Sequence, residues 1–223
     1  GSLIGQGIGQ GQMFLGRLAA NARLTDGQGQ VTASLAGRRG SRFDLQLLAD
    51  VAPQRLAVAA QGQFAGQRIV LPRRAVLTAD GAGGWRLAPT QLDFAGGRAI
   101  ASGLVGTRES DIHLALANMP LSLADVLVSD LGLGGRISGL VDYRQTQRGN
   151  PTGEFKVRIA GLTRSGLVLT SRPIDVALTG SLMTDRLEAR AVASEGGQVR
   201  GRLQGRIAKL ASQGSLAQPL GKG

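Results

Sequence analysis

Strict alternation of apolar and polar residues recurs along this chain and sets the tightest limit on its fold. In the stretch EFKVRI, from Glu154 to Ile159, every second residue is apolar and the residues between them are charged. A period of two places all the apolar side chains on one face of a β-strand and all the polar ones on the other. The same pattern recurs in RFDLQL, in DIHLAL, around Asp175 and from Val199 to Ile207. The apolar positions in these five stretches are Phe43, Leu45, Leu47, Ile112, Leu114, Leu116, Phe155, Val157, Ile159, Ile174, Val176, Leu178, Val199, Leu203 and Ile207.

Turn signals divide these stretches at intervals of ten to fifteen residues, which predicts about fifteen strands. They include DGQG at Asp26, ADGAGG at Ala79, RGNP at Arg148 and SEGG at Ser194. The composition agrees with an all-β fold, because 35 glycines in 223 residues leave little material for amphipathic helices. We therefore predict one long antiparallel meander over residues 1–223, with possible ragged ends at 1–12 and 211–223.

One segment departs from the alternation. In PLSLADVLVSDLGLGG, Ser122 could cap a helix with Asp125 three residues later, and Leu123, Val126 and Leu127 would then share a helical face. We expect a single short helix at about residues 123–130 that covers apolar surface. The alternative is an irregular crossover.

Three related glycine motifs recur: GGRAIASG from Gly96, GGRISG from Gly134 and GGQVRG from Gly196. Each glycine pair is expected to supply the positive φ angles of a tight hairpin. The later glycine of each motif falls on the apolar face, where a missing side chain permits a bulge, a bend or close approach. The residues concerned are Gly96, Gly97, Gly103, Gly134, Gly135, Gly139, Gly196, Gly197 and Gly201.

Catalytic constellations are missing from the sequence, and we expect no enzyme and no cofactor. The chain has no cysteine, and its single histidine, His113, falls on the polar face of a strand. It has no G-x-S-x-G, no P-loop and no pair of histidines at metal-ligand spacing.

The net charge of +11 invites a nucleic-acid interpretation. The arginines are scattered, however, and seven aromatic residues supply few platforms for base stacking. We expect no nucleic-acid partner. Solvated strand faces, helped by attraction to anionic lipid head groups, explain the arginines better. No apolar run is long enough to span a bilayer, and the start GSLIGQGIGQGQ has no signal-peptide pattern, which suggests an excerpt of a longer protein.

Three stretches in succession, WRLAPTQLDFAGGRAIASG, LALANMPLSLADVLVSDLGLGGRISGLVDY and SRPIDVALTGSLMTDRLEARAVASEGGQVRGRLQGRI, resemble the TamB family of AsmA-like bacterial envelope proteins. The resemblance covers residues 81–207. It implies an inner-membrane anchor in the full-length protein, a β-structure that crosses the periplasm, and an outer-membrane barrel partner of the TamA type. It also implies a sheet curled into an open, taco-like trough with an aliphatic interior, which carries phospholipid and supports outer-membrane protein assembly.

The alternation alone leaves a second fold open. In a closed β-sandwich or β-solenoid the apolar faces would meet each other, and the chain would act as a scaffold or adhesin without lipid transport. An open sheet would have two free end strands, so we also expect edge-strand self-association.

Overall fold

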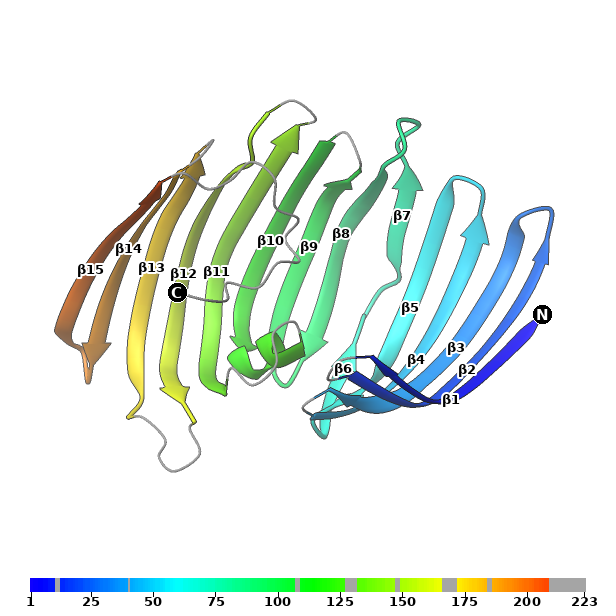
Figure 1. Ribbon diagram of the computed structural model, residues 1–223, viewed down its shortest axis with the longest axis horizontal. Helices are drawn as coiled ribbons and strands as arrows, with labels where there is room; N and C mark the ends of the chain where they lie inside the picture. Colours follow the sequence, from blue (N-terminus) through cyan, green and yellow to red (C-terminus); the bar gives the residue numbers. More distant parts are fainter. Residues whose placement is uncertain are drawn as a thin grey trace.

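The computed structural model describes residues 1–208 except 11–12, 40, 107–108, 127–131, 147–148, 166–171 and 184–185. These residues form one antiparallel sheet of fifteen strands and one short 3₁₀ helix, η1 (Figure 1). The strands are β1 Ser2–Gln10, β2 Met13–Thr25, β3 Gln28–Arg39, β4 Ser41–Ala52, β5 Arg55–Phe64, β6 Gln67–Val70, β7 Ala75–Ala79, β8 Trp85–Phe94, β9 Gly97–Val105, β10 Glu109–Pro120, β11 Leu133–Thr146, β12 Thr152–Arg164, β13 Ile174–Met183, β14 Arg186–Glu195 and β15 Gln198–Ala208. The predicted all-β meander and its number of strands are confirmed.

Every strand pairs with its neighbour in the sequence, except where β6 and β7 share one position between β5 and β8. The Leu71 N–H still donates to the Ala60 carbonyl at 2.8 Å, so the pairing with β5 runs past the end of β6. Pro72 follows, and it has no N–H to donate to the ladder. Pairing resumes when Ala75 lies opposite Val58. The sheet is therefore fourteen positions wide.

Two-residue turns with positive φ at both positions close several hairpins, as their residue types favour. Asp26 and Gly27 have φ angles of 51° and 75°, and Gly196 and Gly197 have 58° and 82°. At Ala95 the φ angle is 48°, although alanine adopts this region at a steric cost. The following residue, Gly96, has a φ angle of 77°.

The helix η1 spans Leu121–Val126, which corrects the expected range in two ways. It is a 3₁₀ helix and not an α-helix, and it begins two residues earlier than expected. Ser122 consequently lies inside the helix and does not cap it. The expected continuation over 127–130 lies outside the described residues. Leu121 and Leu123 both pack on apolar residues of the sheet, so the helix covers apolar surface as expected.

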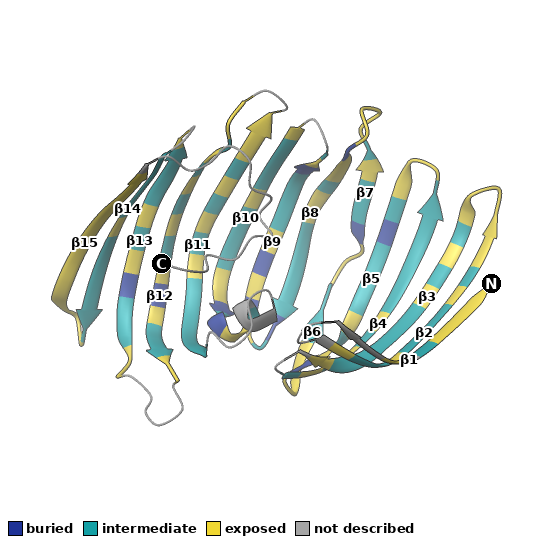
Figure 2. Ribbon diagram, viewed as in Figure 1, coloured by how far each residue is buried: buried dark blue, intermediate teal, exposed yellow. Residues whose placement is uncertain are grey.

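The buried core lies where η1 meets the sheet. Around Met119 it contains Phe64, Phe94 and Ala99, with the two phenylalanine rings 6.0 Å apart and tilted by 60°. A second cluster joins Leu121 of η1 to Ile159 and Val176. Most other positions in the sheet are only half-buried or exposed (Figure 2). The fold is thus a single layer with a compact core at one place.

Candidate functional site: an apolar face across the sheet

One row of aliphatic residues, three glycines and one tyrosine crosses thirteen strands, from β2 to β15, with each residue directly opposite the next in the ladder. It consists of Leu24, Gly29, Val51, Leu56, Leu77, Leu87, Gly103, Ile112, Tyr143, Gly153, Leu182, Leu187 and Ile207. Residues opposite each other in a ladder share a face of the sheet. The row therefore defines one continuous surface, which we call the apolar face, and the reverse side is the polar face.

Parallel rows widen this surface. The row next to η1 joins Met119, Ile137, Ile159 and Val176. Another joins Leu92, Ala99, Leu116, Gly139, Val157, Leu178, Ala191 and Leu203. Between this row and the long row lie Thr90, Ala101, Leu114, Val141, Phe155, Gly180, Ala189 and Gly205.

The register brings the alternating residues named in the sequence together on the apolar face. Phe43, Leu114 and Leu116 all pack against the cluster around Phe94, which ties the first half of the sheet to the second. Leu45 and Leu47 lie two and four residues after Phe43 on β4, so their side chains point to the same face. Ile174 packs against the Leu121 cluster. Val199 lies opposite Ser194, beside an irregularity in the ladder, so pairing alone does not assign its face.

Exposure varies strongly across the apolar face. Ile159 and Val176 are covered beside η1 and are only 8% and 9% exposed. Leu203, on the last strand, is 74% exposed, and Ile207 is 56% exposed. Residues near η1 therefore act as core, whereas the face towards β15 is open in the described structure.

At the β15 end of the apolar face, two small residues lie between two rows that contain leucine. They are Ala189 and Gly205, which lie opposite each other. The flanking rows end in Leu203 on one side and Ile207 on the other. At Gly180, the next residue in the row of Ala189, the Phe155 ring fills the space, because a Cβ there would lie 2.4 Å from it. We use the term furrow for the surface over Ala189 and Gly205, whose side chains are smaller than those on either side.

Sequence reasoning missed several members of the apolar face. Phe64, Phe94, Leu92, Leu87 and Met119 were not named, although Phe64, Phe94 and Met119 contribute the most buried part of it. Bulges explain part of this omission, since β8 shifts register between Leu87 and Thr90, and β10 between Leu116 and Met119. One extra residue breaks a period of two. A search that allowed one skipped residue would have found them.

The glycine motifs differ in role from one copy to the next. Gly196 and Gly197 form a hairpin turn as expected, but in the first motif the turn is Ala95 and Gly96, and Gly97 already begins β9. The expected turn at Gly134 and Gly135 is wrong, because both lie within β11 at a register shift against β12. Gly135 lies opposite two residues of β12, Gly161 and Leu162, so β12 forms a bulge here and the chain does not reverse at Gly135.

The later glycines also divide into two kinds. Gly103 has a φ of 139°, and a Cβ there would come within 1.9 Å of the Asp111 carbonyl oxygen. Gly139 has a φ of 147° and would meet the Lys156 carbonyl oxygen at 2.1 Å. Both permit close approach of the neighbouring strand. Gly201 has open space around it and needs no such freedom.

Arg136, the polar residue of the second motif, links two copies of the pattern. Its Nε donates to the Asn118 carbonyl oxygen at 3.1 Å and to Asn118 Oδ1 at 2.8 Å. Its Nη2 donates to the Ala95 carbonyl oxygen at 2.7 Å, in the turn of the first motif. Asn118 has a φ of 54° at the β10 bulge. The guanidinium therefore holds a strained bulge and a turn together beside the core.

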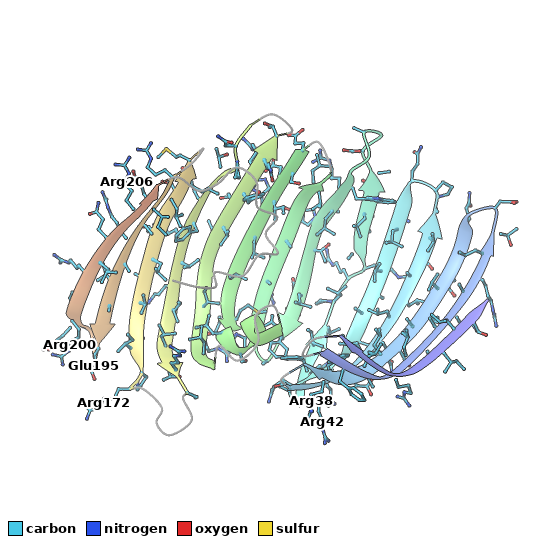
Figure 3. The ribbon with its side chains drawn as sticks, in the orientation of Figure 1. Arg38, Arg42, Arg172, Glu195, Arg200 and Arg206 are labelled. Carbon is cyan, nitrogen blue, oxygen red and sulfur yellow. The ribbon has the colours of Figure 1, made fainter. Side chains whose placement is uncertain are left out.

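Charged side chains gather on the polar face and at the strand ends. Arg38 and Arg42 lie near one end of β3 and β4, and Arg200 pairs with Glu195 at 3.2 Å (Figure 3). Exposed ion pairs of this kind contribute little stability. Asp80 shapes a turn by accepting from the N–H groups of Ala82 and Gly84 at 2.7 and 2.8 Å. The Gly84 hydrogen bond, followed by that from Ala82, holds the pKa of Asp80 below its ordinary value.

His113 lies on the polar face between two carboxylates, with Nδ1 2.6 Å from Asp142 and Nε2 3.3 Å from Asp111. The side chains of His113 and Asp142 are exposed, and that of Asp111 is half-buried. In the part of the chain that the structure describes, no group of three His, Asp or Glu side chains is arranged to hold a metal.

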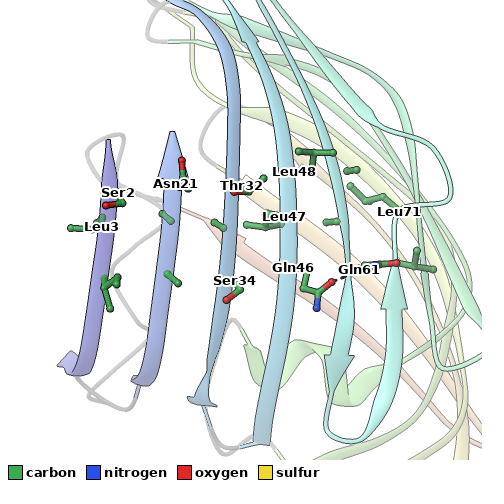
Figure 4. Close-up of a pocket in the computed structure, with 17 residues that line it drawn as sticks. Ser2, Leu3, Asn21, Thr32, Ser34, Gln46, Leu47, Leu48, Gln61 and Leu71 are labelled. Atoms are coloured by element: carbon green, nitrogen blue, oxygen red, sulfur yellow. Dashed lines mark hydrogen bonds between the residues drawn. The ribbon is translucent and has the colours of Figure 1, made fainter. Parts of the chain in front are cut away.

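A hollow of about 740 Å³ lies at the β1–β5 end (Figure 4). Seventeen residues line it. Eleven lie in the rows that begin at Ser2 and Ile4, whose side chains point to the polar face. The other six lie in the row between these two, which begins at Leu3 and belongs to the apolar face. None of the lining residues is charged. This neutral surface is separate from the furrow at β15.

Comparisons with known proteins found no matching family model, no similar curated protein and no similar solved structure. Within the described residues, no helix has the length and apolar character needed to cross a membrane.

Proposed function

We propose that this chain is a segment of a periplasmic bridge that carries phospholipid acyl chains along its apolar face between the inner and outer membranes. The observation that carries this proposal is the apolar row that continues through thirteen neighbouring strands. A path of this kind needs continuity more than it needs specific polar contacts. The missing catalytic constellation fits that requirement.

The apolar face is available for such a role towards β15, where Leu203 and Ile207 are 74% and 56% exposed. Beside η1 the two core clusters cover it. Moving an acyl chain through water costs about 0.8 kcal/mol per methylene, or more than about 10 kcal/mol for a typical chain. Continuous aliphatic contact lowers that barrier at every step along the sheet.

The size of the sheet suits a bridge. Fourteen positions make thirteen spacings of about 4.8 Å, so the described sheet extends roughly 60 Å across its strands. The estimate is shorter than fifteen separate strands would give, because β6 and β7 share a position. Resemblance to the TamB family further supports the bridge, its inner-membrane anchor in the full-length protein, its barrel partner of the TamA type and its role in outer-membrane protein assembly.

The acyl path runs away from η1. Ile159 and Val176 are buried by Leu121, whereas the rows through Val157 and Leu182 are less covered. A chain on these rows reaches the furrow and leaves over β15. Lipid head groups stay in solvent or near the arginines of the polar face.

The alternative scaffold or adhesin requires apolar faces that meet each other. A closed sandwich would pack two sheets face to face, and a solenoid would stack parallel strands. The described strands form one antiparallel sheet, and most of their residues are half-buried or exposed, as expected of a single layer. This observation favours the open lipid path over the closed alternative.

Photo-crosslinking on adjacent positions of β12 tests the proposal. A benzophenone amino acid replaces Val157 on the apolar face in one variant and Lys156 on the polar face in the other. The purified chain is incubated with phosphatidylethanolamine and phosphatidylglycerol vesicles and illuminated. We expect phospholipid adducts at position 157 and few at position 156. Equal yields at both positions, or only intramolecular products at position 157, would contradict the proposal.

A third variant with the same group at Ile159 checks the path. Because Leu121 covers Ile159, this position should give crosslinks within the chain and little lipid adduct. Circular dichroism spectra should remain those of a β-protein in all three variants. A lipid yield at position 159 equal to that at 157 would show that η1 does not bound the path.

A further inference from the structure

The short helix η1 lies on the apolar face and covers part of it (Figure 1). Leu121, its first residue, packs with Ile159 of β12 and Val176 of β13, and all three side chains are buried. Leu123 packs on the neighbouring cluster around Phe94. In the described part of the chain, leucine side chains thus hold η1 on the sheet, across two clusters.

The surface beneath Leu121 belongs to the same apolar face as the proposed lipid path. The row that contains it consists of Met119, Ile137, Ile159, Val176, Ala193 and Gly201. It runs beside the row through Val157, which lies two residues from Ile159 on β12, or about 7 Å along the strand. In the described structure the residues that pack around Leu121, Ile159 and Val176 are also aliphatic: Leu133, Ile137, Leu162, Ile174 and Leu178. This surface therefore has the chemistry of the lipid path and differs from it in being covered.

The cover itself is a weak element. η1 has six residues and 3₁₀ geometry, and a helix this short does not persist in water without tertiary contacts. Its hold on the sheet is hydrophobic contact, which is non-directional. An acyl chain can therefore supply to Ile159 and Val176 the aliphatic contact that Leu121 supplies. An acyl chain that follows the row also contacts the residues on either side of these two.

The strand that leads into η1 is fixed up to its last residue. The Asn118 N–H donates to Ser138 Oγ at 2.8 Å, and Arg136 donates to both oxygen atoms of Asn118. Met119 is only 3% exposed, and Pro120 still lies opposite Arg136 in the ladder. The fixed part of the chain ends there. η1 can consequently leave the apolar face while the pairing of β10 with β11 stays intact.

We infer that η1 is a displaceable cover over a second acyl-chain site, formed by the row through Ile159 and Val176. The inference rests on the proposed lipid path, because it assigns the same ligand to the neighbouring row. A ligand shifts an equilibrium between two states only if it binds one of them better, and an acyl chain binds this row only in the uncovered state. With η1 in place the row is shielded from water. With η1 displaced it joins the path beside Val157.

A photoactivatable lipid tests the inference without adding a bulky group to the protein. Phosphatidylethanolamine with a diazirine in one acyl chain is mixed into vesicles of phosphatidylethanolamine and phosphatidylglycerol. After illumination, mass spectrometry maps the labelled residues. The parent protein should be labelled at Val157 and only weakly at Ile159 and Val176. Leu121→Ala should raise the label at Ile159 and Val176 about tenfold, since a minor open state is populated at about 10% or less, and should leave Val157 unchanged.

Leu114→Ala is the matched control. It removes the same side-chain volume from the apolar face, but Leu114 packs on the cluster around Phe94 and not on that of Leu121. Its label at Ile159 should stay at the parent level, and circular dichroism should show a β-protein in both variants. An equal rise in the two variants would mean that any loss of core volume admits lipid, which overturns a specific role of η1.

A disulfide lock tests displacement within one folded protein, since the chain contains no cysteine of its own. Leu121→Cys combined with Val176→Cys ties η1 to β13 when oxidised and frees it when reduced. The label at Ile159 should be high after reduction and lost after oxidation, with Val157 labelled in both states. A label at Ile159 that responds neither to oxidation nor to Leu121→Ala would overturn the inference and, with Val157 labelled, leave the lipid path standing. No label at either position would contradict both proposals.

Discussion

Replacing Val157 by aspartate places one charge in the middle of the proposed lipid path. Val157 lies between Gly139 and Leu178 in its row, so an acyl chain that follows the row must cross it. A carboxylate and its water displace about two or three methylenes from aliphatic contact, at about 0.8 kcal/mol each. The loss is about 2 kcal/mol. Since 1.4 kcal/mol corresponds to a tenfold change, lipid binding should weaken about thirty-fold.

Val157→Asp should lower the free energy of unfolding by less than its total value, so the variant should still fold. Full burial of a valine side chain contributes about 1.5 kcal/mol or slightly more, and Val157 is only partly buried. The carboxylate remains in contact with water, so it keeps its charge. We expect a loss of about 1 to 2 kcal/mol from a domain stability of about 5 to 15 kcal/mol.

Thr179→Asp is the matched control. Thr179 lies next to Leu178 on β13 but points to the polar face, opposite Lys156. It introduces the same charge at an exposed position. Both variants are titrated with a phospholipid whose acyl chain carries a fluorophore, and their thermal unfolding is followed by circular dichroism. Only Val157→Asp should lose binding.

Equal binding by the two folded variants would refute the reasoning, because the row would then not contact the acyl chain. Should Val157→Asp fail to fold, Val157→Thr keeps the shape and adds only a hydroxyl. This substitution should still weaken binding, by a smaller factor. Unchanged binding in the folded threonine variant would likewise contradict the path.

Four further substitutions test three other features of the structure. Gly103→Ala should destabilise the fold by about 2 kcal/mol or more, because its Cβ would collide with a backbone carbonyl at positive φ, whereas Gly201→Ala should leave the unfolding midpoint unchanged. Gly205→Leu fills the furrow without a clash, since nothing lies within 4 Å of its Cβ, so it should reduce lipid binding and leave denaturant unfolding unchanged. Asp80→Asn concerns pH: the folded pKa of Asp80 lies below its ordinary value, so its stabilising contribution is present above that value and is lost as pH falls through the folded pKa. Acid unfolding followed by fluorescence of Trp85 should therefore show a smaller loss of stability in the asparagine variant.

The sheet was predictable from the sequence because alternation and turn residues act locally. In β12, Glu154, Lys156 and Arg158 are exposed, whereas Phe155 and Val157 between them are partly buried, as the period of two requires. Turns such as Gly196–Gly197 follow from backbone preferences of the residues themselves. These local signals needed no tertiary information.

The positions of the bulges, and which apolar residues are buried beside η1, could not be predicted from local signals. The pair at Gly134 and Gly135 resembles a turn sequence, yet it lies within β11, opposite a bulge in its partner strand β12. Similarly, Ile159 and Val157 look equivalent in EFKVRI, but only Ile159 is covered beside Leu121. Both differences depend on residues distant in sequence, which the alternation does not contain.

The distribution of large and small residues explains how one surface can hold its shape and still leave room for a ligand. Near η1, Phe64 and Phe94 supply volume, and Met119 fills the remaining space, so the face closes into a core. Towards β15 the row that contains Met119 ends in Ala193 and Gly201, and the furrow consists of Ala189 and Gly205. These small residues add almost no height above the backbone. Backbone pairing, and not side-chain packing, must hold this part of the sheet together. That leaves its aliphatic surface free to exchange water for acyl chains, which is the property a lipid path requires.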